Sequence, residues 1–127
     1  MKQRIEVQKS LNDNGLFVNA DAQQLKQVVL NLLLNSIEAM ERGGRIELTT
    51  QPGHDAIMLR ITDTGCGIEA EALHRVWDPF FTTKERGMGL GMAIVRSVVE
   101  RHGGRIAISS TPGRGTTVEL SLPVIYS

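Results

Sequence analysis

Two asparagines, Asn31 and Asn35, lie four residues apart in a segment whose other side chains are nearly all apolar. Because a helix advances about 100° per residue, the polar residues of this segment would lie in one stripe along a helix: Gln24, Gln27, Asn31, Asn35, Glu38 and Arg42. Because the rest of such a helix must be buried, this stripe is not ordinary solvent-facing surface. Neutral amide oxygens suit Mg²⁺, which keeps waters and phosphate oxygens in its shell. The asparagine pair, flanked by Glu38, therefore favours a magnesium site, with a solvated edge stripe as the alternative.

A carboxylate, Asp63, ends a segment in which apolar residues occupy alternate positions from 57 to 61. Asp63 continues that alternation, so in a strand its side chain faces the core. A buried carboxylate needs a hydrogen-bonding partner, and the following glycines, Gly65 and Gly67, allow the backbone to approach closely. Asp63 is thus placed to accept from an exocyclic amine such as N6 of adenine. A turn or capping role is the alternative.

A glycine-rich segment precedes a second predicted helix, and it consists of Gly87, Met88, Gly89, Leu90 and Gly91. Small residues before a helix present backbone N–H groups and the positive end of the helix dipole to an anion. The segment is not the dinucleotide fingerprint, because position 92 is methionine, and the chain contains neither a P-loop nor protein-kinase landmarks. By itself the pattern is a weak indication of phosphate binding.

An aromatic stretch, WDPFFTTK at residues 77–84, lies between these segments and holds three of the five aromatic residues of the chain. Its composition predicts a lid that aromatic side chains anchor, with Lys84 reaching a phosphate as a point charge. A hydrophobic cluster beneath a loop is the alternative, and the two are compatible.

The remaining candidates are single residues. Thr116 shares strand parity with apolar residues at 118, 120 and 122, so its hydroxyl faces inward and needs a partner in backbone, water or ligand, with backbone as the default. Cys66 fits between two glycines and has no neighbouring histidine, which favours an incidental role. His54, His74 and His102 match no metal-site spacing, and His102 suits a helix C-terminus.

The elements that must position these residues alternate between strand-like and helical patterns. We expect short strands at about 5–9 and 16–18, a turn at 12–15, and a helix from an Asp21 cap, with Gln24 three residues on, to about Arg42. A hairpin at 45–50 and 56–62, a short helix at 69–75, a helix at about 90–102 and strands at 105–110 and 116–122 follow. Glycine pairs at 43–44 and 103–104 end the long helices. This order predicts an α/β sandwich in which several strands form one sheet and the two long helices cover one of its faces.

Composition limits the class of protein. The 127 residues fit one domain, residues 1–127, and 14 basic residues balance 14 acidic ones. A net charge of zero argues against duplex nucleic acid or direct contact with an anionic membrane. One cysteine, no membrane-length apolar run and no signal-peptide core favour a cytoplasmic location.

The motifs together resemble the N, G1, F and G2 boxes of bacterial sensor histidine kinases, in that order: NLLLNS (31–36), DTGCGI (63–68), DPFF (78–81) and GMGLG (87–91). The ending GGRI (103–106), GTTV (115–118) and LP (122–123) is similar too, so the resemblance covers about residues 3 to 123. NSIEAM (35–40) and FFTTK (80–84) resemble the nitrogen-regulation and oxygen-sensing branch.

The resemblance implies the Bergerat, or GHKL, fold, a two-layer α/β sandwich whose mixed sheet is covered on one face by helices, with ATP between the helices and a lid. It implies that Asn35 coordinates Mg²⁺ and Asn31 lies near the phosphates, that Asp63 takes the adenine amino group, and that Thr116 supports the base through water. It also implies that Gly65 and Gly67 shape the base pocket, that the segment 87–91 caps the phosphates, and that Lys84 contacts them from the lid. The implied nucleotide-contacting set is Asn31, Asn35, Glu38, Asp63, Gly65, Gly67, Ile68, Lys84, Gly87, Met88, Gly89, Leu90, Gly91 and Thr116.

Two departures refine this expectation. No histidine has the acidic residue and proline that follow a phosphoacceptor histidine, so the chain resembles a catalytic and ATP-binding domain alone. Its implied partner is the dimerisation and phosphotransfer domain of the same parent, which can be membrane-anchored, with a response regulator reached indirectly. Asn31 stands where related ATPases carry a glutamate general base, and an amide cannot take a proton from water. Slow hydrolysis and phosphoryl transfer are therefore expected.

Three alternatives remain at this stage. A stand-alone anti-sigma-factor serine kinase resembles the asparagine and glycine boxes but generally lacks the aromatic box. An ATP-gated clamp of the chaperone, mismatch-repair or topoisomerase type is disfavoured by Asn31. A degenerate scaffold that binds partners without nucleotide is disfavoured by the intact set of motifs.

Overall fold

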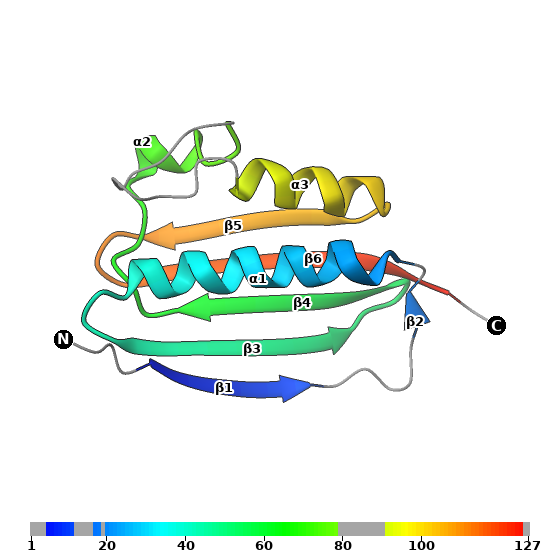
Figure 1. The fold of residues 1–127 in the computed structure, drawn as a ribbon, viewed down its shortest axis with the longest axis horizontal. Helices are drawn as coiled ribbons and strands as arrows, with labels where there is room; N and C mark the ends of the chain where they lie inside the picture. The colour runs from blue at the N-terminus through cyan, green and yellow to red at the C-terminus, as the bar shows by residue number, and fades with distance from the viewer. Residues whose placement is uncertain (1–4, 12–16, 19, 79–90, 126–127) are drawn as a thin grey trace.

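The computed structural model describes residues 5–11, 17–18, 20–78 and 91–125 (Figure 1). The elements in chain order are β1 (Ile5–Leu11), β2 (Phe17–Val18), α1 (Ala22–Ala39), β3 (Gly44–Pro52), β4 (Ala56–Asp63), α2 (Ala70–Leu73), α3 (Gly91–Arg101), β5 (Arg105–Thr111) and β6 (Gly115–Ile125). These bounds confirm the predicted alternation of strands and helices. The turn predicted at 12–15 and most of the aromatic stretch at 77–84 lie outside the described residues.

A six-stranded mixed sheet forms one layer, with β1, β3, β4 and β6 as consecutive neighbours. β6 also pairs with β5 along most of its length and with β2 at its end. Among the described strands, only the β1–β3 pair is parallel, and the other four pairs are antiparallel. Helices α1 and α3 lie side by side across one face of this sheet (Figure 1), which confirms the predicted two-layer sandwich.

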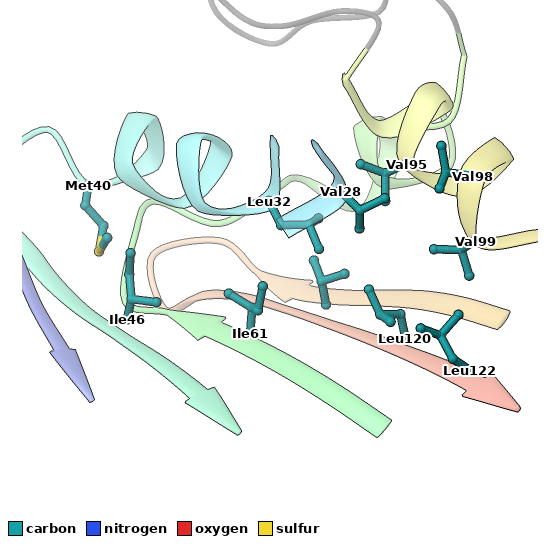
Figure 2. Packing of buried hydrophobic residues seen from close by; sticks show 11 residues of the cluster. Val28, Leu32, Met40, Ile46, Ile61, Val95, Val98, Val99, Leu120 and Leu122 are labelled. Carbon is teal, nitrogen blue, oxygen red and sulfur yellow. The ribbon is translucent and has the colours of Figure 1, made fainter. Parts of the chain in front are cut away.

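The core fills the space between these layers (Figure 2). Alternate residues of β4 and β6 point toward the helices, because successive side chains of a strand face opposite sides. Valines of α3 and the apolar stripe of α1 pack against them. The buried cluster consists of Val28, Leu32, Met40, Ile46, Ile61, Val95, Val98, Val99, Val118, Leu120 and Leu122. No helix in the described part of the chain is long and apolar enough to cross a membrane.

The start of α1 confirms its predicted cap. The Asp21 carboxylate accepts a hydrogen bond from the Gln24 backbone N–H at 3.1 Å, as an N-cap does. The backbone N–H of Asp21 itself goes to a distant partner, Nε2 of His102, at 3.0 Å. The capping-box pattern is therefore completed from α3.

The end of α1 differs from the prediction. The helix stops at Ala39 rather than at about Arg42, and Met40 leaves it with φ −115° and ψ 59°. Two tertiary contacts explain the early end. The Met40 side chain is buried against the sheet at 2% exposure, and the carbonyl of Ala39 accepts a hydrogen bond from Cys66 N–H at 3.0 Å. A tight turn then closes through Gly43 N–H to the Met40 carbonyl at 2.9 Å, with Gly43 at φ 90°.

Candidate nucleotide site

A polar row crosses the helix-covered face of the sheet at one end. Asp63 of β4 is paired with Thr116 of β6, and Thr116 is paired with Ser110 of β5. In the next row along the same face, these three strands carry only apolar residues: Ile61, Val118 and Ile108 are cross-strand neighbours there. Oxygen-bearing side chains thus gather where the apolar core ends and the loop after β4 begins.

Asp63 faces inward as its parity predicted, and its residue is only 5% exposed. One carboxylate oxygen, Oδ1, accepts both the Gly65 backbone N–H at 2.9 Å and the Thr116 backbone N–H at 3.3 Å. A carboxylate offers about four acceptor positions on its two oxygens. These two hydrogen bonds orient the group and leave acceptor capacity for a ligand amine.

Ser110 was not identified from the sequence, yet it links three parts of this site. Its Oγ accepts the Ile68 backbone N–H at 2.8 Å, donates to the Gly115 carbonyl at 2.9 Å, and lies 2.8 Å from Oγ1 of Thr116. The default backbone partner expected for the Thr116 hydroxyl is therefore replaced by a side chain. The parity of Ser110 with Ile106 and Ile108 was the one signal available in the sequence.

The glycines of the loop after β4 permit close packing. A Cβ on Gly65 would lie 2.6 Å from the Ala39 carbonyl, at the end of α1. Gly67 has φ 75°, and a Cβ there would collide with the backbone of Thr111, the last residue of β5. Between them Cys66 bridges both elements through its backbone, donating to Ala39 O and accepting from Gly113 N–H at 2.8 Å. The loop is thereby held between α1 and the β5–β6 turn.

The asparagine pair lies on the inner side of α1, where the stripe argument placed it. Asn31 is 4% exposed, and its Oδ1 accepts from Gln27 Nε2 at 3.2 Å. Asn35 is half-buried, and its Nδ2 donates to the thioether sulfur of Met92 at 3.4 Å. The two amides therefore differ: Gln27 engages the oxygen of Asn31, whereas Met92 engages the nitrogen of Asn35.

The side chains near α1 determine what kind of metal site could form there. Within the described residues, no three His, Cys, Asp or Glu side chains come together as a ligand cluster. The Asn35 amide offers one oxygen, which fits Mg²⁺ only where phosphate oxygens and waters complete the shell. Glu38 is half-buried and lines a pocket of about 350 Å³ between the end of α1 and the loop after β4, together with Gly65 and Cys66.

Several predicted contacts lie outside the described residues, namely Lys84, Gly87, Met88, Gly89 and Leu90. Gly91 is described, and it is buried as the first residue of α3. Trp77, from the predicted aromatic lid, lies under the Arg96 guanidinium of α3 at 5.3 Å from its ring centroid. This stacked pair attaches the start of the aromatic stretch to α3.

His102 links the start of α1 to the end of α3 by hydrogen bonds. Its Nε2 accepts from the Asp21 backbone N–H at 3.0 Å, and its Nδ1 lies 2.8 Å from the Val98 carbonyl. Because a backbone N–H can only donate, Nε2 carries no hydrogen, and Nδ1 is the donor. The histidine is thus a bridge between α1 and α3 rather than only the helix C-terminal residue that the sequence suggested.

The chain is similar in sequence to known proteins. Residues 20–125 match the family model described as histidine kinase-, DNA gyrase B-, and HSP90-like ATPase. The sensor histidine kinase ZraS of Escherichia coli K12 is 42% identical over 120 residues, which are 94% of this chain but 26% of that protein. The chain therefore spans about a quarter of the length of this relative.

Solved structures show the same fold. The catalytic domain of the histidine kinase ThkA superposes with a TM-score of 0.83 at 32% identity, over 94% of this chain and 78% of that one. Full-length ShkA in complex with AMPPNP superposes with a TM-score of 0.84 at 26% identity, over 97% of this chain and 26% of that one.

Proposed function

The chain belongs to the histidine kinase-, DNA gyrase B- and HSP90-like ATPase family, among the catalytic domains of sensor histidine kinases, and from this we propose its reaction. It binds Mg²⁺-ATP and donates the γ-phosphoryl group to a histidine on a separate dimerisation domain, in two-component signalling. That domain belongs to the same parent protein, and a response regulator receives the phosphoryl group afterwards. The complex of the similar ShkA with AMPPNP supports the choice of nucleotide.

The observation that carries the proposal is the polar row of Asp63, Thr116 and Ser110, at the end of a sheet face that is otherwise apolar across β4, β5 and β6. The adenine ring lies over this row, and its amino group donates to Asp63, whose Oδ1 is already fixed by two backbone N–H groups. Ile68 is half-buried and its backbone is held by Ser110, so it is suited to a wall of the base pocket.

The phosphates extend from the base along α1 toward the start of α3. Asn35 lies beside Met92 in the first turn of α3, so its amide oxygen and the N-terminal N–H groups of that helix serve the same phosphate group. Mg²⁺, held by Asn35, would neutralise charge on the phosphate oxygens. Asn31 and Glu38 line the same path on α1, and Lys84 with residues 87–90 completes it from the lid.

Asn31 favours transfer of the γ-phosphoryl group to a protein rather than to water. Its amide oxygen accepts from Gln27, and an amide has no basicity with which to activate water. Positioning and charge stabilisation are then the main contributions of the protein to phosphoryl transfer. This argues against the ATP-gated clamp, which depends on hydrolysis.

A two-part assay tests the proposal. Calorimetry should detect Mg²⁺-dependent ATP binding, and radiolabelled ATP should label a dimerisation domain of a similar sensor kinase supplied in trans. Hydrolysis by the chain alone should stay close to the uncatalysed background. Absence of ATP binding, or steady turnover without an acceptor domain, would contradict the proposal. Labelling of a serine on an added partner would favour the serine-kinase alternative.

A further inference from the structure

We infer that Ser110 is a positioning residue that sets base selectivity, because it fixes the direction of the hydrogen bond made by the Thr116 hydroxyl. The inference rests on the proposed nucleotide function and adds to it a residue, on β5, that does not itself need to touch the base. Three contacts of one oxygen atom carry the argument.

The direction follows from counting hydrogens. A serine hydroxyl has one hydrogen and two lone pairs. The Ile68 backbone N–H can only donate, so it occupies one lone pair of Ser110 Oγ. The Gly115 carbonyl can only accept, so it takes the single hydrogen of Ser110. The contact between Ser110 and Thr116 must therefore use the hydrogen of Thr116 and the second lone pair of Ser110.

The consequence appears at the base pocket. With its hydrogen turned toward Ser110, Thr116 Oγ1 presents only lone pairs to a ligand. Asp63, its neighbour in the cross-strand register, is a carboxylate and also presents only lone pairs. A purine edge that contacts Thr116 and Asp63 directly at this point must then donate. An amino group at position 6 satisfies this requirement, whereas a keto oxygen would face acceptors with no hydrogen between them.

Removing the Ser110 hydroxyl frees the hydrogen of Thr116. A threonine hydroxyl rotates to suit its surroundings when no partner holds it, so in Ser110→Ala it can donate to a keto oxygen at position 6. The Asp63 carboxylate still disfavours the keto oxygen, because both groups are acceptors. The preference for a 6-amino group should therefore fall without disappearing. Ser110→Ala also loses the hydrogen bonds to Ile68 and Gly115, and this loss weakens binding of nucleotides with a 6-amino group and with a 6-keto oxygen equally. The ratio of these two affinities therefore separates a change in selectivity from a merely structural effect.

The experiment compares ATP with ITP, which carries a keto oxygen at position 6, each with Mg²⁺, by isothermal titration calorimetry. We expect the unaltered protein to bind ATP at least about tenfold more tightly. Ser110→Ala should lower that ratio about threefold or more, and Ser110→Thr, which keeps one hydroxyl, should retain it. Ser109→Ala is the matched control, since Ser109 is exposed on the opposite face of β5, and it should leave the ratio unchanged.

Coupling to Thr116 gives a second arm. Thr116→Val should itself lower the ratio, since it removes the inward-facing acceptor, and in that background Ser110→Ala should have no further effect on it. An unchanged ratio in Ser110→Ala, or in Thr116→Val if Ser110→Ala does not fold, would overturn the inference. If the unaltered protein bound ATP and ITP equally well, the inference would be overturned but the proposed function would stand. Absence of ATP binding would overturn the proposed function as well.

Discussion

Asn35 of α1 donates a hydrogen bond from Nδ2 to the sulfur of Met92, 3.4 Å away, in the first turn of α3. A thioether sulfur is an acceptor only, so the nitrogen of the amide must face Met92. The amide oxygen of Asn35 is thereby left for other partners. A weak hydrogen bond thus decides which atom of the proposed metal ligand is available.

Met92→Leu should weaken Mg²⁺-dependent nucleotide binding. Leucine keeps the volume of the side chain but cannot accept a hydrogen bond, so the Asn35 amide loses its fixed orientation. We expect the affinity for Mg²⁺-ATP to fall about threefold, with little change in the affinity measured in EDTA. Calorimetry with and without Mg²⁺ checks both, and Met58→Leu, on a strand of the sheet away from α3, is the control. An equal loss in both buffers would mean that Met92 acts only through packing.

Asp63→Asn should reduce ATP affinity about tenfold to a hundredfold. The amide keeps one oxygen for the N–H groups of Gly65 and Thr116 but replaces the other acceptor by a donor and removes the charge. Direct calorimetric titration measures the loss. Asp55→Asn, in the exposed β3–β4 turn, should bind normally. ATP affinity within twofold of the unaltered protein would exclude Asp63 from base recognition.

His102→Phe should destabilise the fold by about 1–2 kcal/mol, because the Asp21 N–H and the Val98 carbonyl lose their side-chain partner. Urea denaturation followed by circular dichroism gives the free energy of unfolding. His74→Ala replaces an exposed histidine and should change it by less than about 0.5 kcal/mol. Equal effects of the two substitutions would show that the bridge between α1 and α3 contributes nothing measurable.

Gly65→Ala should destabilise the domain by about 1–3 kcal/mol and weaken nucleotide binding. The added methyl group would meet the backbone of Ala39 at 2.6 Å, which a rigid helix end cannot avoid without moving the loop that Asp63 anchors. Gly53→Ala offers the comparison, since its nearest neighbour would be 3.2 Å away. Thermal unfolding with and without ATP measures both effects. A fully stable, ATP-binding Gly65→Ala variant would refute the close-packing argument.

The sequence predicted the features that depend on local periodicity. Alternation placed Asp63 and Thr116 on the inner face, and helical spacing placed Asn31 and Asn35 on the inner side of α1. Asp21 was identified as a cap because its interaction spans only three residues. Lys84 and residues 87–90 stay predictions.

The features that were missed depend on contacts between distant segments. Ser110 at the end of a strand has no local signal of its bonding, which arises only from the β5–β6 register and the approach of Ile68. Met92 reads as an ordinary packing residue, although its sulfur meets α1. The apolar pattern continues through Met40, and a hydrogen bond from Cys66 marks where α1 ends.

The position of β6 in the chain has a consequence for biogenesis. This strand comes last among the described elements, pairs with β2, β4 and β5, and carries Thr116. A chain emerging from the ribosome therefore has no completed sheet, and the proposed base pocket lacks Thr116, until β6 follows β5 out of the exit tunnel. The pairings of β6 with β2 and β4 are long-range and form late. Acquisition of nucleotide binding would then report the moment when β6 has emerged and paired.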